Sequence, residues 1–330
     1  GIFDMSSFGK IRVDGVGALN FLQEICTAQI NIQIGRIVYT QMLNEKGGIE
    51  SDLTISRLGE KSFLLVVPCA TLQRDLSYLN RKNNSNEVMI FDISSSEGVL
   101  SIMGPNSRKL LECVSPNNFS NSAHPFGTWK NIEIGSGLAR AHRVSYVGEL
   151  GWEIYISSDQ CAHVFEEIWK FQKETNFNLC GIHALDSCRI EKAYRHFGHD
   201  ITDEDHIVDA GLSFTADLSK KNFEGKESIL TKRKIGSSKK MLQFKLNDPS
   251  KMIYHNEPVL RDNKIVGYLT SGNFGHTLGG CIGLGYVDSK NLSNEEILSF
   301  DYSIDVAGEI VTAEASLKPM YDPKSERVRM

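Results

Sequence analysis

The sequence has 330 residues, which is enough for two or three domains with a sizeable core. Apolar residues make up 41% and charged residues 23%, a balance typical of globular proteins, and the net charge is −5. Binding to nucleic acid needs a concentrated basic surface, so this charge argues against nucleic acid as the main partner. No apolar run of about 18 residues occurs, so we expect no membrane span.

The cysteine and histidine patterns limit the chemistry further. The seven cysteines form no C-x-x-C pair and are odd in number, which favours free, buried thiols in a reducing compartment such as the cytoplasm or the mitochondrial matrix. The nine histidines form neither H-x-x-x-H nor H-E-x-x-H, so no metal site is predicted. A G-x-G-x-x-G after a strand and a Walker A motif are both lacking, so no nucleotide-binding fold is predicted.

The first 235 residues mix strands and helices. Strands are predicted at 9–15, at 37–58 around a Gly47-Gly48 turn, and at 61–68, 88–93, 98–105 and 139–157. Helical spacing of apolar residues predicts helices at 16–28, 72–80, 106–114, 159–174 and 181–198.

The pattern changes to short strands separated by turn residues after about residue 235. Asp262-Asn263 predicts a hairpin turn between two of these strands. We therefore expect a separate all-β domain, joined by the short polar segment 234–240.

Three stretches combine polar residues with glycine turns: "YTQMLNEKGGIESD", "SYVGELGWE" and "DSCRIEKAYRHFGHDIT". Asp52 stands at the head of an apolar run, and Tyr39 lies thirteen positions earlier on the neighbouring strand, so we expect both side chains to face one pocket. Strand alternation predicts Trp152 in the core and leaves Glu149 exposed at the turn.

Two carboxylates with aromatic walls suit a flat, nitrogen-rich ring such as a pterin. Glu153, at the start of another strand, would be the second carboxylate, and Arg189 would suit the anionic tail of a folate. These residue types also fit many other pockets, and Glu153 and Arg189 are equally consistent with ordinary surface charges.

Longer motifs resemble the aminomethyltransferase (T-protein) superfamily, and most of all the C-terminal folate-binding region of sarcosine and dimethylglycine dehydrogenases. The motifs are "FDMSSFGK", "YTQMLNEKGGIESDLTISRL", "RVSYVGELGWEIYI", "DSCRIEKAYRHFGHDI", "DAGLSFTADLSKKNFEGKESIL" and "YDPKSERV". The resemblance implies an α+β, three-lobed folate-binding fold. The implied lobes are a discontinuous folate-binding lobe (1–60 and 140–233), an α/β insertion (61–139) and a C-terminal β-barrel-like domain (241–330).

The resemblance also implies a role for each candidate residue. Asp52 corresponds to the acid that contacts the reactive folate nitrogens and handles a proton, and Tyr39 lies beside it. Tyr146 lines the pterin pocket, Glu153 holds the pyrimidine edge, and Arg189 meets the folate tail.

The implied reaction passes an iminium or aminomethyl carbon from oxidised sarcosine or dimethylglycine to tetrahydrofolate, giving 5,10-methylenetetrahydrofolate. Ser6-Ser7-Phe8 stands where the glycine-cleavage T-protein usually has Ser-His-Met, which favours the dehydrogenase-linked branch over lipoyl-carrier chemistry. FAD would then be carried by a domain missing from this chain or by a separate flavoprotein subunit. A stand-alone folate-dependent aminomethyl or methyl transferase and a non-catalytic regulatory subunit remain as alternatives.

Overall fold

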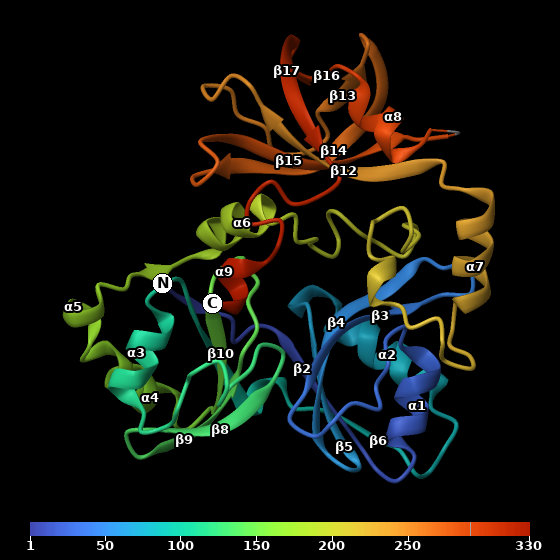
Figure 1. Cartoon of the computed structure of the whole chain (residues 1–330). Helices are drawn as coiled ribbons and strands as arrows, with labels where there is room; N and C mark the ends of the chain where they lie inside the picture. The colour runs from blue at the N-terminus through green and yellow to red at the C-terminus, as the bar shows by residue number, and fades with distance from the viewer. Residues whose placement is uncertain (291) are drawn as a thin grey trace.

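The computed structural model of the chain describes residues 1–290 and 292–330. Its strands form two open sheets and one closed barrel, and each of the three builds one lobe of the molecule (Figure 1). The first lobe lies at the lower right of this view, the second at the lower left and the barrel at the top. The expected α+β fold with three lobes is therefore confirmed.

The first lobe is an antiparallel sheet in the order β3-β4-β5-β2-β6. Ile11 of β2 and Ile55 of β4 pack in one buried cluster with Leu22 of α1 and Leu79 of α2. The two helices therefore cover one face of the sheet, and the core of the lobe lies between them. The elements are β2 (Gly9–Asp14), α1 (Ala18–Ile25), β3 (Ile37–Leu43), β4 (Ile49–Gly59), β5 (Ser62–Val67), η1 (Cys69–Thr71), α2 (Leu72–Lys82) and β6 (Met89–Asp92).

The second lobe is a six-stranded sheet in the order β11-β1-β7-β10-β9-β8. In its central strand β10, Trp152 and Ile154 face a core that includes Leu111 of α3 and Val164 of α4. Because side chains alternate along a strand, the odd-numbered residues of β10 face the other way. The elements are β1 (Ile2–Asp4), η2 (Ser94–Ser96), β7 (Glu97–Met103), α3 (Ser107–Val114), β8 (Trp129–Ile134), β9 (Gly137–His142), β10 (Gly151–Ser157), α4 (Cys161–Trp169), α5 (Gln172–Thr175) and β11 (Leu179–Cys180).

The third lobe is a closed barrel in the order β12-β15-β14-β13-β16-β17, which closes because β12 pairs with both β15 and β17. Asp262 and Asn263 both have positive φ, 50° and 63°, as the predicted tight hairpin turn requires. The β-barrel-like domain expected after residue 235 is confirmed, although it also contains one short helix, α8. The elements are β12 (Lys239–Leu246), β13 (Pro258–Arg261), β14 (Lys264–Gly275), β15 (Gly280–Asp288), α8 (Asn294–Ser299), β16 (Tyr302–Val306) and β17 (Glu309–Ser316).

Four short elements connect the lobes: α6 (Ile182–Glu191), η3 (Ser213–Thr215), α7 (Lys226–Ile235) and α9 (Glu326–Arg329). In Figure 1, α6 lies between the second lobe and the barrel, and α7 runs from the first lobe to the barrel. α9 returns to the second lobe, where Arg143 donates to the Arg329 carbonyl. The return is held by the buried Lys192, whose Nζ lies 2.8 Å from Asp322 Oδ2. In the part of the chain that the structure describes, no helix is long and apolar enough to cross a membrane.

The lobe boundaries differ from those implied by the resemblance. β5 begins after residue 60 and pairs with both β4 and β2, so the first lobe continues through β6 instead of ending at residue 60. Residues 140–180 pair within the second sheet, together with β1 and β7. They therefore belong to the second lobe, although Tyr155 also packs on β5, and the later part of 140–233 packs on the first lobe. Which strands pair is decided by contacts between distant segments, which local sequence patterns do not report.

The thiols match the sequence expectation only in part. All seven cysteines are free. Cys26 and Cys281 are buried as expected, but Cys69 is exposed and the other four are partly exposed.

Candidate functional site

Asp52 lies in a small polar network on one face of the β3–β4 hairpin. Gln41 stands directly opposite Asp52 in the strand register, and Tyr39 lies two residues before Gln41, so all three side chains share a face. Gln41 Nε2 donates to Asp52 Oδ1 at 2.7 Å, and the Tyr39 hydroxyl lies near enough to this carboxyl to lower its pKa. Tyr39 and Asp52 are therefore neighbours as expected, although Asp52 lies within β4 and not at its head.

The environment of Asp52 makes its carboxylate unusually basic. Burial raises the pKa of Asp52 to about 6, although the hydrogen bonds from Gln41 and Tyr39 and the positive charge of Arg195 each lower it. A carboxyl with this pKa is mostly ionised at neutral pH and accepts a proton more readily than an ordinary aspartate. A buried carboxyl with this pKa has the chemistry that a general base needs.

Two residues of this network, Gln41 and Thr215, were missed by sequence reasoning. Gln41 is 0% exposed, and its Oε1 accepts a hydrogen bond from the hydroxyl of Thr215, 174 residues later in the chain. The one available signal for Gln41 was a polar residue inside the strand pattern "YTQML". Thr215 gave no signal, because its contact with β3 exists only in the folded chain.

Tyr146 reaches the same region from the turn between β9 and β10. Its hydroxyl donates to the carbonyl of Arg195 at 2.8 Å, and its ring stacks on Tyr194 with the centroids 6.1 Å apart. Burial is the main cause that raises the pKa of Tyr146, and the negative charge of Asp52 adds to it. The charge of Asp52 therefore reaches Tyr146, which lies in the same region of the molecule.

Glu153 points away from the core of the second lobe, on the face of β10 opposite Trp152. The Tyr155 hydroxyl donates to Glu153 Oε2 at 2.8 Å, and Tyr155 itself packs with Leu64 and Val66 of β5. Glu153 therefore lies where the second lobe meets the first, and it is partly buried, not an ordinary exposed charge. Burial raises the pKa of Glu153 to about 7, although the hydrogen bond from Tyr155 lowers it.

Two further expectations for this turn have different outcomes. Trp152 is 0% exposed, so its predicted place in the core is confirmed. Glu149 was expected to be exposed, and this was wrong: it is partly buried and accepts a hydrogen bond from the Tyr321 hydroxyl. The C-terminal segment that carries Tyr321 folds back over the turn, which only the tertiary structure reveals.

Arg189 is a buried ion-pair partner in the structure. It is 1% exposed, its Nε lies 2.7 Å from Asp186 Oδ1, and its Nη1 is bonded to Asp200 Oδ2. The alternative of a surface charge is therefore wrong. The predicted contact with a folate tail stays a prediction, and an anionic tail that reached Arg189 would compete with these two carboxylates.

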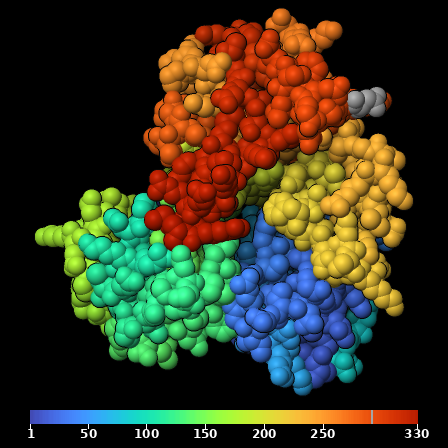
Figure 2. Space-filling view, viewed as in Figure 1, coloured from blue at the N-terminus to red at the C-terminus, as the bar shows by residue number. Residues whose placement is uncertain are grey.

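The surface is hollowed where the three lobes meet (Figure 2). Within the residues that the structure describes, no group of three or more His, Cys, Asp and Glu side chains could hold a metal ion. The chemistry that the site itself offers is therefore that of its carboxylates, phenols and amide. It can take up a proton at Asp52 and accept hydrogen bonds at Glu153.

Two family models match the chain. The GCVT N-terminal domain matches residues 1–220, and the glycine cleavage T-protein C-terminal barrel domain matches residues 239–322. The second match coincides with the six-stranded barrel.

Several curated proteins are similar over nearly the whole chain. The 4-methylaminobutanoate oxidase (formaldehyde-forming) of Paenarthrobacter nicotinovorans is 38% identical over 99% of the chain, and human mitochondrial sarcosine dehydrogenase is 33% identical over 99%. The chain spans only 39% and 38% of the length of these two relatives. The aminomethyltransferase of Halothermothrix orenii is 33% identical over 94% of the chain, and the match covers 87% of that enzyme.

The fold also matches a solved structure. The glycine cleavage system aminomethyltransferase T from Bartonella henselae superposes with a TM-score of 0.85 over 98% of the chain and 86% of that protein, at 24% identity. At this identity the match shows the fold alone.

Proposed function

Because the chain belongs to the glycine cleavage T-protein (aminomethyltransferase) family, we propose that it binds tetrahydrofolate and transfers a one-carbon unit to it. The observation that carries this proposal is the Asp52 carboxyl, which has a pKa of about 6 and lies between Tyr39 and Gln41 beside Tyr146.

The side chains at the site fit a folate. The pyrimidine edge of a pterin donates N–H groups, and Glu153 supplies a partly buried carboxylate whose Oε2 already holds Tyr155. Among the residues that the structure describes, Oε1 of Glu153 has no such partner and is free to accept from a ligand. Tyr146 presents a flat ring fixed by its own hydroxyl, which suits packing against a planar ring system.

The proposed chemistry of the chain is proton handling. Tetrahydrofolate, when bound, would supply the nucleophilic nitrogen that takes up the one-carbon unit. Asp52 accepts the proton that the attacking nitrogen loses as the first C–N bond forms and passes it to the donor amine, which leaves as its own C–N bond breaks and the second folate nitrogen closes on the carbon. The negative charge of Asp52 stabilises the cationic carbon donor before attack. Gln41 and Tyr39 keep the carboxylate directed and ionised at neutral pH.

We further propose that the donor is an oxidised N-methyl amine such as that formed from sarcosine or dimethylglycine, and that the product is 5,10-methylenetetrahydrofolate. Two of the relatives are named for the oxidation of N-methyl amines, and this chain spans less than two fifths of each. The FAD that such an oxidation uses would be carried by another domain or subunit.

A stand-alone aminomethyl or methyl transferase is the second candidate. It is favoured by the match to the Halothermothrix orenii aminomethyltransferase, most of whose length the chain covers. The two candidates differ in whether transfer needs a flavoprotein.

The experiment is a titration of tetrahydrofolate into the purified chain by calorimetry, followed by a transfer assay. We expect a dissociation constant in the micromolar range for the wild type and for Glu133→Gln, a control that changes an exposed glutamate of the same lobe. Glu153→Gln should bind at least about tenfold more weakly, because it lacks the charged acceptor. Asp52→Asn should still bind.

The transfer assay measures 5,10-methylenetetrahydrofolate formed by two routes: from sarcosine with an added flavin-dependent sarcosine dehydrogenase, which supplies the two-electron oxidation, and from an aminomethyl donor already at the oxidation level of formaldehyde, without flavoprotein. Product above that of the flavoprotein alone in the first route, with none in the second, supports the dehydrogenase-linked function, and product in the second route supports the stand-alone transferase. Unchanged product formation by Asp52→Asn would show that Asp52 is not the proton acceptor. No binding by the wild type would refute the folate site and favour a regulatory role.

A further inference from the structure

The hydrogen-bond network behind Asp52 reaches a distant part of the chain. Gln41 is 0% exposed and Thr215 is 9% exposed, so water has little access to the amide between them. The amide donates to Asp52 at 2.7 Å on one side and meets the Thr215 hydroxyl on the other. Thr215 is held on the η3 turn, where its hydroxyl also lies 2.8 Å from the Leu212 carbonyl.

The direction of these hydrogen bonds follows from the ionised carboxylate. An ionised Asp52 can only accept, so the buried Gln41 amide must turn its Nε2 toward Asp52. Oε1 then faces Thr215, and the hydroxyl is the group that can donate to it. Thr215 therefore stabilises the amide in the orientation that an ionised Asp52 requires, with its one hydroxyl proton shared between Gln41 Oε1 and the Leu212 carbonyl.

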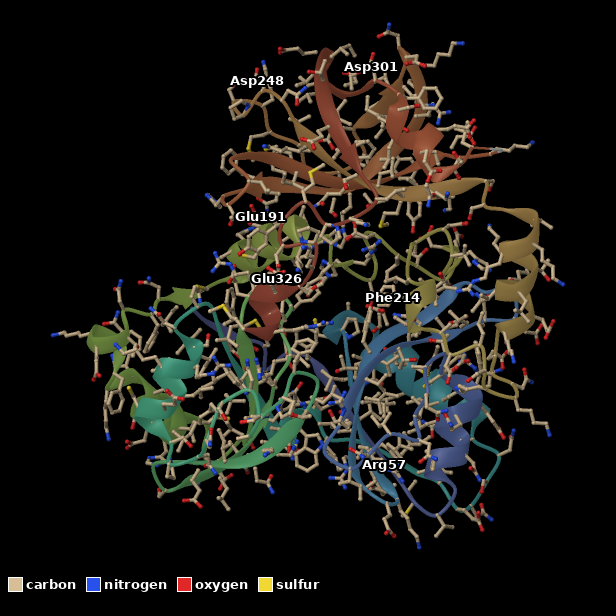
Figure 3. All side chains as sticks on the ribbon, in the orientation of Figure 1. Arg57, Glu191, Phe214, Asp248, Asp301 and Glu326 are labelled. Atoms are coloured by element: carbon tan, nitrogen blue, oxygen red, sulfur yellow. The ribbon has the colours of Figure 1, made fainter. Side chains whose placement is uncertain are left out.

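We propose that Gln41 and Thr215 are positioning residues that hold the Asp52 carboxylate in its orientation and in its ionised form. The inference rests on the proposed function only in giving Asp52 its role as proton acceptor. The η3 turn thereby becomes part of the site, although it lies far from β3 and β4 in the sequence. Figure 3 shows Phe214, next to Thr215, in the region between the first lobe and the barrel.

Other charged and titratable groups near Asp52 have different titration ranges. Tyr39 faces it from β3, Tyr146 from the β9–β10 turn, and Arg195 from the segment after α6. Burial raises the pKa of both tyrosines above their usual value. Titration of the Asp52 signal near pH 6 therefore reports Asp52 itself.

The test follows the Asp52 side-chain carbon by NMR in protein labelled with ¹³C-aspartate, without folate. The signal is identified by its absence in Asp52→Asn. Gln41→Leu should raise the pKa of Asp52 by about one unit or more, because the ionised form loses a charge-assisted hydrogen bond. Thr215→Val should raise the pKa of Asp52 by about half a unit. Without the hydroxyl, the buried Gln41 Oε1 has no donor while Asp52 is ionised, whereas a protonated Asp52 can donate to it once the amide turns over.

Two control variants separate positioning from general disturbance. Thr215→Ser keeps the hydroxyl and should keep the wild-type pKa. Thr175→Val removes a hydroxyl that donates to the Phe171 carbonyl at 2.8 Å in the second lobe, and it should also leave the Asp52 pKa unchanged. A wild-type pKa in Gln41→Leu, or equal pKa values in Thr215→Val and Thr215→Ser, would overturn the proposal.

A measurement on the wild type keeps the proposal testable if a variant does not fold. The side-chain amide signals of Gln41 should shift with the same midpoint as the Asp52 carbon, because the amide donates to the titrating group. Amide signals that do not shift over this pH range would refute the hydrogen bond between Gln41 and Asp52. Since no folate is present, a failure of folate binding leaves these outcomes unaffected.

Discussion

Asp200 joins the segment after α6 to the barrel, and removing its side chain should lower the free energy of unfolding. The side chain is 0% exposed. It pairs with Arg189, accepts from the hydroxyls of Thr270, at 2.6 Å, and Ser271 in β14, and accepts from the His196 backbone N–H at 2.9 Å. Four donors, two of them in the barrel and two in α6 and the segment after it, therefore depend on one carboxylate.

The expected loss of stability in Asp200→Ala follows from the buried charge of Arg189, which would lose its ion-pair partner. Arg189 is 1% exposed and would retain the Tyr194 carbonyl and one carboxylate, Asp186, whose side chain is 30% exposed. Breaking a buried ion pair from one side costs about 3–5 kcal/mol in free energy of unfolding. Asp200→Asn keeps the shape and part of the hydrogen bonding, so its loss should be near the lower end of this range.

The assay is urea unfolding followed by circular dichroism, with Asp248→Ala as the control. Asp248 is exposed, so its variant should stay within about 0.5 kcal/mol of the wild type. Adding Arg189→Met to Asp200→Ala should restore part of the loss, because the uncompensated charge is gone. A loss below about 1 kcal/mol in Asp200→Ala would refute the reasoning.

The same pair has a pH signature. Burial alone would raise the pKa of Asp200, but Arg189 and the hydroxyl donors outweigh it and lower the pKa below its usual value. A lowered carboxyl pKa gives stability that is present above the unfolded pKa of about 4 and is lost as the pH falls through the folded pKa. The difference between wild type and Asp200→Ala should therefore shrink below about pH 4.

Three further predictions concern the site and the backbone. Asp52→Asn should raise the free energy of unfolding by about 1–2 kcal/mol at pH 7, because the raised pKa of Asp52 shows that its ionised form destabilises the folded state. This gain should grow as the pH rises from about 4 to about 6. Thermal melts at several pH values measure it, and a difference that does not change with pH would contradict it. Tetrahydrofolate affinity should fall about tenfold per pH unit below pH 7 as Glu153 takes up a proton, and calorimetry of Glu153→Gln should lack that slope. Gly48→Ala should lose about 1–3 kcal/mol, because its Cβ would lie 1.9 Å from the Asp203 carbonyl oxygen, whereas Gly181→Ala, with nothing within 4 Å, should melt like the wild type.

Local patterns in the sequence determined a large part of the fold. The Asp262-Asn263 turn, the hairpin around Gly47-Gly48 and the burial of Trp152 all depend on residues a few positions apart. Turn chemistry and strand alternation act over that range, so they could be predicted. The hairpin also placed Tyr39 beside Asp52, and the motifs of the whole chain indicated the family that the comparisons then showed.

The tertiary structure alone decided which distant segments complete the site. It paired β1 with β7 and β11, brought Tyr321 onto Glu149, and set Thr215 behind Gln41. These contacts join residues that are roughly one hundred to two hundred positions apart, where periodicity and turn signals carry no information. Their partners are chosen by which buried polar groups must find donors and acceptors once the lobes close on one another.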